Sequence, residues 1–390
     1  MRIAIIVSGW PSIYRPNSMP FFYEQVGAIA KDESIKIDVY IPFSITHYLK
    51  PRNIIKFFMG EFESFCSLSK DNVKLIPVPY VNLPKVLGFQ NILDQLKVNT
   101  VCKSFGRKTK LKGSYDFVHC HFFSSAIIGC EINKRFGTPY LITEHASDLK
   151  LGMGSYKTGF INNVYGNAKK VIAVGEYLRE QLLSTIESID QVELIPNGID
   201  GTKFKLAKGA KVEIKLIFIG HLIPRKGILE LLVAFKEIKN KYEKVSLTII
   251  GEGELRDQVE QYVSTEKIES CVELMGALNN ENVALELSRH HLLVLPSDKE
   301  SFGVVVIEAG ACGLPVVARK SGGPEYIIDD SSLGEIYDGT NSSLVNSIDT
   351  VLNKIELYKH QHIRDITLSK YDWSIVAKKI ISLYKQMINN

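Results

Sequence analysis

The chain has 390 residues, which is longer than a typical single domain, and length alone favours two or three domains, with two the better estimate. Hydrophobic residues make up 45% and charged residues 23%, as in ordinary soluble globular proteins, so the composition argues against disorder over most of the chain. The 47 basic and 43 acidic side chains leave a net charge of +4, which is too small to indicate nucleic-acid binding.

The six cysteines stand singly, mostly inside apolar runs, without the paired spacing of a zinc site or a disulfide framework. We therefore expect buried, reduced thiols in a cytoplasmic protein. The first residues, MRIAIIVSGWP, are predicted to form a strand and not a signal peptide. No run approaches the ~20 apolar residues that a membrane-spanning helix needs, which leaves peripheral attachment at the inner face of a membrane as the open alternative.

Short apolar runs rich in β-formers alternate with helix-length amphipathic segments along the whole chain. This alternation predicts an α/β fold in which parallel sheets carry helices on both faces. In the first half, strands are predicted at 3–7, 35–41, 73–78, 117–121, 139–145, 170–174 and 192–196. A second series begins at 215–220 and continues at 246–250, 272–275, 292–296 and 315–318.

The segment between the two series, residues 197–210, is polar and glycine-rich and contains the turn signals Asn-Gly and Asp-Gly. We place a hinge there and predict an N-terminal domain over 1–200 and a C-terminal domain over 201–372. The last segment, 373–390, has a helical period and is expected to cross back onto the first domain. Two doubly wound domains would face each other across a cleft at the carboxyl ends of their strands.

Two segments of the first half combine basic and apolar residues, namely 47–59 (HYLKPRNIIKFFM) and 85–112. The second segment contains one acidic residue, Asp94, and seven basic residues: Lys85, Lys97, Lys103, Arg107, Lys108, Lys110 and Lys112. This pattern fits a surface for an anionic membrane or an anionic acceptor, and it fits a solvated helix face equally well.

A pair of adjacent cations follows the first predicted strand of the second half. Arg225 and Lys226 lie in the segment GHLIPRKG, at the expected N-terminus of a helix. Backbone N–H groups and the helix dipole would reinforce them, and each charge-assisted hydrogen bond is worth roughly 1.5–3 kcal/mol when shielded from water. A diphosphate fits such a site better than a carboxylate does.

Two familiar nucleotide-binding patterns are incomplete in this chain. The segment GHLIPRKG lacks the Gly-Lys-Ser/Thr ending of a Walker A loop, so ATP hydrolysis loses support. Gly251-Glu252-Gly253 lacks the third glycine of the dinucleotide fingerprint. It is interpreted equally well as a tight strand-to-helix turn and as a loop beside a nucleotide.

The segment 293–315 (LVLPSDKESFGVVVIEAGACGLP) reads as a strand, a loop and a helix that carry two glutamates. Glu300 lies in the loop, and Glu308 lies two turns into the helix. The apolar run 304–307 is expected to be buried, so Glu308 would line a pocket and accept hydrogen bonds from ligand hydroxyls. An anion or a sugar would meet the N–H groups of Ser301, Phe302 and Gly303. The alternative is a pair of carboxylates that cap and solubilise an ordinary strand–helix unit.

These motifs together resemble the family-4 glycosyltransferases of the GT-B fold. The matching segments occur in the order of that family, at 220–227 (GHLIPRKG), 251–254 (GEGE), 295–303 (LPSDKESFG) and 322–325 (GGPE), with Glu308 eight residues after Glu300. Asn197-Gly198-Ile199-Asp200 at the hinge is similar to the same family. The resemblance covers nearly the whole second half and implies an α/β GT-B fold, with two facing Rossmann-like, doubly wound domains and an interdomain cleft.

The resemblance implies roles for individual residues. Arg225 and Lys226 would hold the diphosphate of a sugar nucleotide, Glu308 the ribose hydroxyls, and Glu300 the donor sugar. The nucleobase would lie against backbone groups near residues 275–277. The donor-binding set implied in this way is Gly9, Gly220, Arg225, Lys226, Gly251, Glu252, Met275, Gly276, Ala277, Glu300, Ser301, Phe302, Gly303, Val304 and Glu308.

The first half resembles the family less closely. The segment 143–148 (TEHASD) is similar to the family's His-containing strand end, with His145 reaching the donor sugar and Ala146 where a glycine is common. Residues 8–11 (SGWP) and 21–25 (FFYEQ) resemble the first loop and helix of polysaccharide-building members. Gly9 would approach the donor, and Met19-Pro20 replaces the usual glycine. Trp10 either stacks on an acceptor sugar or covers the core.

The activity implied is a hexosyltransferase reaction from a UDP- or GDP-sugar to a saccharide or lipid-linked saccharide, with retention of configuration, in capsule, O-antigen or similar cell-surface polysaccharide synthesis. The predicted catalytic residues are His145, Glu300, Arg225 and Lys226. The sequence contains no Asp-x-Asp triplet and no cluster with metal spacing, so neither a metal nor another cofactor is expected. Arg225, Lys226 and helix N-termini would then stabilise the leaving diphosphate.

No carboxylate of the first half stands out as a nucleophile, so we favour attack on the face from which the leaving group departs, with the leaving phosphate taking the acceptor's proton. Two other classes stay open. A sugar-nucleotide epimerase or a phosphorylase of the same fold would share these motifs. A non-catalytic sugar-nucleotide-binding partner would share them as well.

Overall fold

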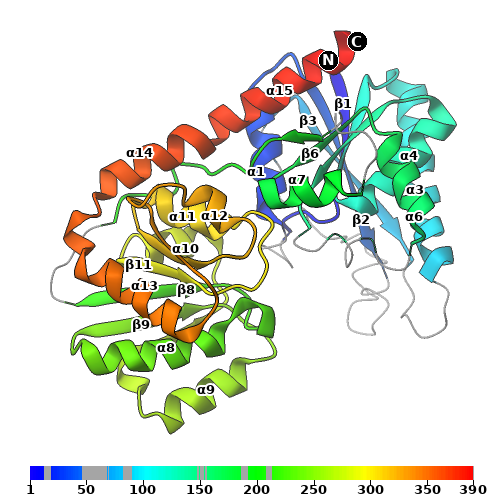
Figure 1. Ribbon diagram of the computed structural model, residues 1–390. Coiled ribbons are helices and arrows are strands. Elements are labelled where there is room, and N and C mark those ends of the chain that lie inside the picture. Colours follow the sequence, from blue (N-terminus) through cyan, green and yellow to red (C-terminus); the bar gives the residue numbers. More distant parts are fainter. Residues whose placement is uncertain are drawn as a thin grey trace. The chain divides into compact units, whose positions relative to one another are not determined.

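The computed structural model describes residues 1–12, 19–45, 68, 70–81, 90–146, 149, 153, 156–185, 192–207 and 213–389. The chain forms two compact units, each with a central sheet and packed helices (Figure 1). Unit 1 comprises Met1–Val174, Leu178–Ile195 and Ala377–Asn390. Unit 2 comprises Gly175–Tyr177 and Pro196–Val376.

Unit 1 is built on a seven-stranded parallel sheet with the order β3-β2-β1-β4-β5-β6-β7. Its strands are β1 (Arg2–Ile6), β2 (Lys36–Ser44), β3 (Val73–Tyr80), β4 (Phe117–His121), β5 (Tyr140–Glu144), β6 (Lys170–Ala173) and β7 (Val192–Leu194). The helices are α1 (Pro20–Ile29), α3 (Gln90–Lys112), α4 (Phe123–Phe136), α6 (Thr158–Gly166), α7 (Glu176–Leu183) and, from residue 377 onward, α15 (Trp373–Asn389).

Unit 2 contains a six-stranded parallel sheet with the order β10-β9-β8-β11-β12-β13. Its strands are β8 (Ile214–Ile219), β9 (Val245–Ile250), β10 (Val272–Gly276), β11 (Leu292–Leu295), β12 (Val316–Arg319) and β13 (Gly334–Tyr337). The helices are α8 (Ile228–Lys241), α9 (Arg256–Thr265), α10 (Asn280–Leu287), α11 (Val304–Ala311), α12 (Pro324–Ile327), α13 (Asn341–Asn353) and α14 (His360–Tyr371), with 3₁₀ turns η3 (Pro224–Lys226), η4 (Glu269–Cys271) and η5 (Ile355–Leu357).

The central strands form the cores of both units because they are apolar on both faces. Residues 3–7 of β1 and the following turn are fully buried, and so are residues 292–294 of β11. A strand covered by helices on both sides needs such a continuous apolar run, whereas a half-exposed strand would alternate. The sequence pattern that predicted parallel sheets is therefore a direct consequence of two-sided burial.

All the predicted strands are present, with ends that shift by at most about three residues. The structure adds one strand that the sequence analysis missed, β13, whose four residues GEIY are too few to stand out as an apolar run. Gly334 begins this strand with φ 143°, and a Cβ there would lie 1.9 Å from the carbonyl oxygen of Val316 on β12. Glycine is thus needed where β13 approaches its neighbour.

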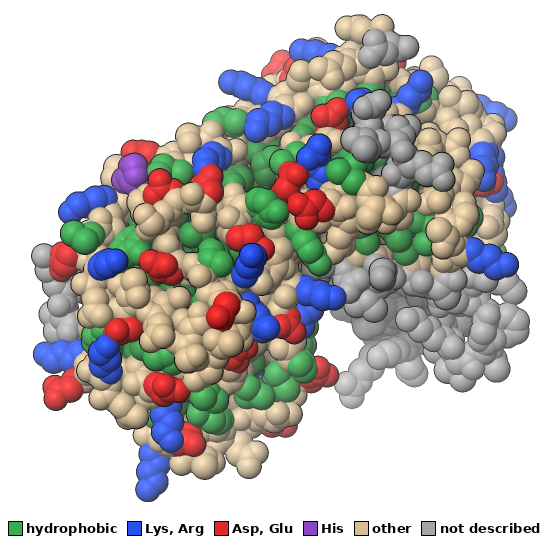
Figure 2. Space-filling model, in the orientation of Figure 1, with side chains coloured by type: hydrophobic (Ala, Val, Ile, Leu, Met, Phe, Trp, Pro, Cys, Tyr) green, Lys and Arg blue, Asp and Glu red, His purple; other side chains and the backbone are tan. Residues whose placement is uncertain are grey.

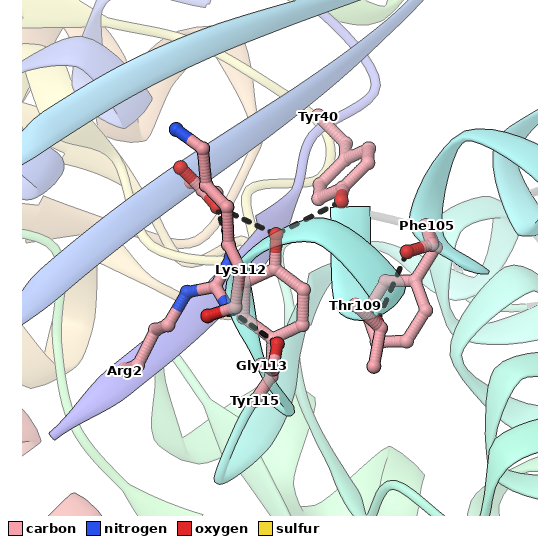
Figure 3. Close-up of polar contacts among 8 residues, drawn as sticks. Arg2, Tyr40, Phe105, Thr109, Lys112, Gly113 and Tyr115 are labelled. Atoms are coloured by element: carbon pink, nitrogen blue, oxygen red, sulfur yellow. Dashed lines mark hydrogen bonds and ion pairs between the residues drawn. The ribbon is translucent and has the colours of Figure 1, made fainter. Parts of the chain in front are cut away.

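A buried carboxylate ties the amino end of the sheet in unit 1 to the end of α3 (Figure 3). Asp38, with 8% of its side chain exposed, accepts hydrogen bonds from the Tyr115 hydroxyl at 2.5 Å and from the Arg2 guanidinium at 3.0 Å. Arg2 also donates to two backbone carbonyls at the end of α3. One belongs to Lys112, the last residue of the helix, at 2.8 Å, and the other to Gly113, the residue after it. One carboxylate therefore orients the arginine that caps this helix.

The five cysteines in the described ranges, Cys102, Cys120, Cys130, Cys271 and Cys312, are all buried and free, as the sequence predicts. Burial raises the pKa of the Cys312 thiol to about 12. No helix in the ranges given above is both long enough and apolar enough to cross a bilayer.

We expect Asp38→Ala to lower the free energy of unfolding of unit 1 by about 3 kcal/mol, because it leaves the Arg2 guanidinium without its carboxylate in a largely buried place. Glu33→Ala is the matched control, since Glu33 is an exposed carboxylate at the same edge of the sheet and should change stability by less than about 0.5 kcal/mol. Urea denaturation followed by circular dichroism measures both. Equal losses in the two variants would contradict the role given to Asp38.

Candidate functional site

The sheet of unit 2 has its topological switch point between β8 and β11. In open α/β sheets, ligands bind outside the carboxyl ends of the strands at such a point, because the connections leaving the two strands run to opposite sides. The loop after β8 carries Arg225 and Lys226, and the loop after β11 carries Glu300. The fold thus brings together the two segments that the sequence analysis selected independently.

The loop after β8 passes through the 3₁₀ turn η3 and enters α8 at Gly227. Gly227 has φ 69°, and a Cβ there would lie 2.3 Å from the carbonyl oxygen of Pro296 after β11, so only glycine fits. The sequence predicts Arg225 and Lys226 at a helix N-terminus, and the structure places them in the turn η3, immediately before α8. Gly227, in the left-handed region, separates the two elements.

Lys226 and Glu300 form an ion pair across the switch point, with only 15% and 12% of their side chains exposed. Arg225 donates to the carbonyl of Lys299 at 2.8 Å, and the Asp298 N–H donates to the carbonyl of Arg225 at 2.9 Å. The loops after β8 and β11 are thereby joined. The sequence analysis assigned Lys226 and Glu300 to different parts of a ligand, whereas the structure pairs them with each other.

The segment 321–325 supports the Glu300 loop from the next strand, β12. The carboxylate of Glu325 accepts hydrogen bonds from the N–H groups of Ser321 at 3.2 Å and of Gly322 at 2.9 Å, and the Glu300 N–H donates to the carbonyl of Ser321 at 3.0 Å. Glu325 is a supporting residue to which the sequence analysis gave no role. The sequence feature that could have indicated this role is the position of Glu325 at the start of the short helix α12, where a carboxylate meets free N–H groups.

Helix α11 presents Glu308 on a half-exposed face. Glu308 and Val304 are four residues apart and lie one above the other. The prediction that residues 304–307 are all buried is wrong for Val304 and Val305, which are partly exposed, whereas Val306 and Ile307 are buried. Only the latter two face the core, because a helix on a sheet buries one stripe of its surface. The exposed stripe is the one that carries the carboxylate.

The loops after β9 and β10 lie beside the loop after β8. The Leu222 N–H donates to the carbonyl of Glu252 at 3.0 Å, and the Gly251 N–H donates to the carbonyl of Gly276 at 2.8 Å. Gly251 has φ 148°, and a Cβ there would lie 1.8 Å from the carbonyl oxygen of Gly220. Gly251, the first glycine of the GEG segment, is therefore required because the two loops come into close contact there.

Every predicted donor-site residue of unit 2 lies in these loops, among the last two residues of β10 or in the first two turns of α11, at the carboxyl edge of the sheet. They are Gly220, Arg225, Lys226, Gly251, Glu252, Met275, Gly276, Ala277, Glu300, Ser301, Phe302, Gly303, Val304 and Glu308. The side chains of two of these residues have other surroundings. Phe302 is buried, and the exposed Glu252 forms an ion pair with Arg256 at 2.6 Å. Gly9 and His145 belong to unit 1.

Unit 1 has its own switch point, between β1 and β4, and a cavity of about 220 Å³ opens at this edge of the sheet. Its lining residues are Ser8, Met19, Phe122, Phe123, Ser124, Glu144, Ala146 and Leu149. Met19 has φ 48°, in the left-handed region where glycine is unstrained, and it stands where the resembled family often has glycine. Trp10, for which two interpretations were open, is 2% exposed and packs edge-on against Tyr23 at 5.7 Å, so it is part of the core.

His145 lies directly after β5, between aromatic rings and a second histidine. Its Nε2 is 3.0 Å from Nδ1 of His121, and the rings of Phe21 and Phe122 are 5.1 Å away. Ala146 stands where the resembled family often has glycine, but its φ is not among the positive values of the described residues, so alanine fits. Ser147 and Asp148 of this segment are outside the described residues.

Glu144 holds the backbone at His145, a role that the sequence analysis missed. Its Oε1 accepts hydrogen bonds from the N–H groups of His145 at 2.9 Å and Ala146 at 3.0 Å, while Oε2 accepts one from the Tyr165 hydroxyl at 2.8 Å. Burial raises the pKa of Glu144, and these hydrogen bonds oppose that rise. The turn that carries His145 is thus set by a buried carboxylate.

Two family models match the chain, Glycosyltransferase Family 4 over residues 70–203 and Glycosyl transferases group 1 over residues 202–364. The relative named Uncharacterized glycosyltransferase MJ1178, from Methanocaldococcus jannaschii, is 26% identical over 351 residues, which cover 89% of this chain and 94% of the relative. The Phosphatidyl-myo-inositol mannosyltransferase of Mycobacterium leprae is 24% identical over 323 residues, 80% of this chain and 82% of that relative.

Solved structures share the fold over the full length. Sucrose-phosphate synthase from Thermosynechococcus elongatus has a TM-score of 0.79 at 19% identity and covers 100% of this chain and 99% of that chain. Anabaena HepE in complex with UDP and glucose has a TM-score of 0.73 at 17% identity, with 99% of each chain covered.

Two parallel Rossmann-like sheets, the loop contacts at their carboxyl edges and these matches define a glycosyltransferase of the GT-B fold. The chain belongs to glycosyltransferase family 4. The family and the fold class predicted from the sequence are both confirmed.

The pH dependence of stability should report the buried histidines of β4. Burial lowers the pKa of His119 to about 3 and that of His121 well below its usual value. Both are neutral when folded but take up protons near pH 6.5 when unfolded, so the stability of unit 1 falls as pH drops from about 6.5 toward 3. Each such histidine contributes about 1.4 kcal/mol per pH unit in this window. Urea midpoints between pH 7.5 and 5 measure the slope.

His119→Gln is the matching variant for this pH experiment. It should reduce the slope of stability against pH by the contribution of one histidine, because glutamine does not titrate. A slope identical to that of the wild type would show that His119 is not held neutral in the folded state.

Proposed function

We propose that this protein is a retaining, metal-independent hexosyltransferase. It moves a sugar from a UDP- or GDP-sugar to a saccharide or lipid-linked saccharide in cell-surface polysaccharide synthesis, such as that of a capsule or an O-antigen. The observation that carries the proposal is the Lys226–Glu300 ion pair beside Arg225 at the switch point of unit 2. The UDP and glucose named with the HepE structure support a nucleotide-sugar donor.

The geometry suits a diphosphate on η3. A phosphate that approaches Arg225 and Lys226 exchanges the carboxylate of Glu300 for its own oxygens, so Lys226 keeps a negative partner and Glu300 is released toward the donor sugar. Glu308, on the exposed stripe of α11, would accept hydrogen bonds from the ribose hydroxyls. Because the diphosphate gains charge as the glycosidic bond breaks, the two cations stabilise the transition state more than the ground state.

The acceptor belongs to unit 1 in this proposal. The cavity of about 220 Å³ beside Ser8 and Glu144 lies at the same edge of the sheet as His145. His145 would stabilise the positive charge that develops on the donor sugar. Phosphatidyl-myo-inositol in the name of the M. leprae relative supports a lipid-linked acceptor. Retention rests on the family resemblance, with the leaving phosphate taking the acceptor's proton.

We expect Arg225→Ala and Lys226→Ala each to lower kcat/KM by about 100-fold, since each removes a cation from the leaving group. Lys226→Met and Glu300→Gln should be less than additive in the double variant, because the two side chains form one pair. Transfer of radiolabelled sugar measures these effects. Lys244→Ala is the control, an exposed lysine of unit 2 at the opposite end of the sheet, and should leave transfer unchanged.

The same assays separate the other functions. UDP and GDP, tested in EDTA by thermal shift, should raise the melting temperature of the wild type and not that of Lys226→Ala. Transfer that EDTA abolishes would contradict a metal-independent reaction. Product formed without an acceptor, or only with inorganic phosphate, would indicate an epimerase or a phosphorylase instead. If the purified protein did not turn over any donor, the result would favour a non-catalytic sugar-nucleotide-binding protein.

We also propose that unit 1 binds an anionic membrane surface through α3. Basic and acidic side chains are interspersed on the face seen in Figure 2, whereas residues 95–112 contain no acidic residue. The exposed cations of α3 are Lys103, Arg107, Lys110 and Lys112, and Leu111 beside them is 80% exposed. Lys112 also lines a cavity of about 770 Å³ in which Lys36, Lys70 and Lys74 lie beside the carboxylates of Glu33, Asp38 and Asp71.

One residue of the predicted basic segment does not contribute to this surface. The ammonium of Lys97 lies 5.8 Å from the centre of the Tyr80 ring, and burial lowers the pKa of Lys97, so this partly exposed side chain packs against the unit. Lys85 and the other basic segment, 47–59, lie outside the described residues. The proposal therefore rests on the carboxyl-terminal half of α3.

The double variant Lys103→Gln/Lys110→Gln should bind phosphatidylserine vesicles about 30-fold more weakly, since each cation near such a surface is worth about 1 kcal/mol. The matched control is Lys244→Gln/Lys354→Gln, two exposed lysines of unit 2. Co-sedimentation in low and high salt measures the affinity, which salt should weaken. Binding that is equal in both variants, or indifferent to salt, would remove the proposal.

A further inference from the structure

Three imidazole rings form a column at the edge of the sheet in unit 1. His119 and His121 are two residues apart on β4, so they lie on the same face of the strand. Their ring centres are 4.3 Å apart with planes at 30°, and the ring centre of His145 lies 5.3 Å beyond His121. Two of the three rings are fully buried, and His145 is at the open end.

The contact between His121 and His145 is a hydrogen bond between nitrogens, Nδ1 of His121 and Nε2 of His145, at 3.0 Å. A neutral imidazole has one N–H and one lone pair, so each ring uses one defined nitrogen for this bond. Burial holds His121 neutral, since its pKa is well below the usual value. The bond therefore couples the tautomer of His145 to that of His121.

The surroundings leave these rings little freedom. Phe22 packs against both, with its ring centre 4.6 Å from that of His121 and 5.4 Å from that of His145. Behind His121, His119 is fixed by hydrogen bonds between its Nδ1 and the Tyr384 hydroxyl at 2.6 Å and between its Nε2 and the Thr143 hydroxyl at 2.7 Å. His119 supports the column but makes no hydrogen bond to His145 itself.

We propose that His121 is a positioning residue for glycosyl transfer. Its Nδ1 holds Nε2 of His145, and this bond sets the plane of the His145 ring and selects one of its tautomers. The inference rests on the proposed function, in which His145 reaches that sugar. It assigns a role to a histidine that the motif at the end of β5 does not contain.

Three substitutions at His121 separate this role from simple packing. Asparagine places an amide where Nδ1 of histidine lies, glutamine places its amide near Nε2, and leucine has neither. We expect kcat to fall about 10- to 100-fold in His121→Leu and His121→Gln, the range seen when an outer hydrogen bond that orients a functional group is removed. His121→Asn should stay within about threefold of the wild type. The KM for the donor should change by less than about threefold in all of them.

His119→Gln is the matched control on the same strand. It removes a buried histidine with two hydrogen bonds and so costs stability to a similar degree, but it leaves the bond between His121 and His145 in place. It should therefore keep kcat within about threefold of the wild type. An equal loss of kcat in His119→Gln and His121→Leu would overturn the proposal, because the column would then be merely structural.

Nitrogen NMR of the imidazole groups tests the proposal without any turnover. In the wild type, His145 should show one protonated and one unprotonated nitrogen, which is the pattern of a single tautomer. In His121→Leu the two shifts should move toward each other as tautomers exchange, and in His121→Asn they should stay apart. A single unchanged tautomer in all variants, or wild-type kcat in a folded His121→Leu, would overturn the proposal.

The two proposals fail in different ways. If His145→Ala transfers sugar at the wild-type rate, the function given to His145 is wrong, and a catalytic role for His121 is overturned with it. If His145→Ala is inactive while the tautomer of His145 is independent of residue 121, only the positioning role is overturned.

Discussion

The half-buried ion pair between Lys226 and Glu300 is the interaction on which the rest of the structure in unit 2 converges. The two residues belong to loops that leave neighbouring strands on opposite sides of the switch point, and a parallel sheet brings the ends of such strands together. Gly227 permits the close approach of the two loops, and Glu325 holds the second loop in place. Removing two charges from water costs several kcal/mol each, and these two side chains offset that cost by pairing with each other.

Unit 1 uses buried polar groups in a comparable way, but with carboxylates and imidazoles held neutral or fully hydrogen-bonded. Asp38 organises the amino edge of the sheet, and Glu144 organises the carboxyl edge. Polar groups without hydrogen bonds would destabilise such a core by about 1–3 kcal/mol each, which is why each of these side chains has defined partners. Histidines on β4 and β5 then join the structural network of the core to the edge where ligands bind in this class of fold.

Much of the fold could be predicted from the sequence, because strands that are buried on both faces appear in it as continuous apolar runs. Apolar runs such as residues 3–7 and 292–295 marked the central strands, and glycines and adjacent cations marked the loops after them. β13 left no such trace, since a four-residue edge strand has few apolar positions. The burial of Val304 and Val305 was misjudged because periodicity gives the direction of a helix face only relative to its own axis, and not to the sheet beneath it.

The sequence by itself determined the fold class and the family, and it predicted Arg225, Lys226, Glu300 and Glu308 as one set, because these residues belong to short motifs with local spacing. Only the tertiary structure decided that Lys226 pairs with Glu300, that Glu325 and Glu144 hold loops, and that His121 contacts His145. The Lys226–Glu300 and His121–His145 contacts join segments that belong to different strands or follow them, so their distances depend on strand order and register. The register between strands cannot be derived from the order of side chains alone, because it is defined only when the sheet has formed.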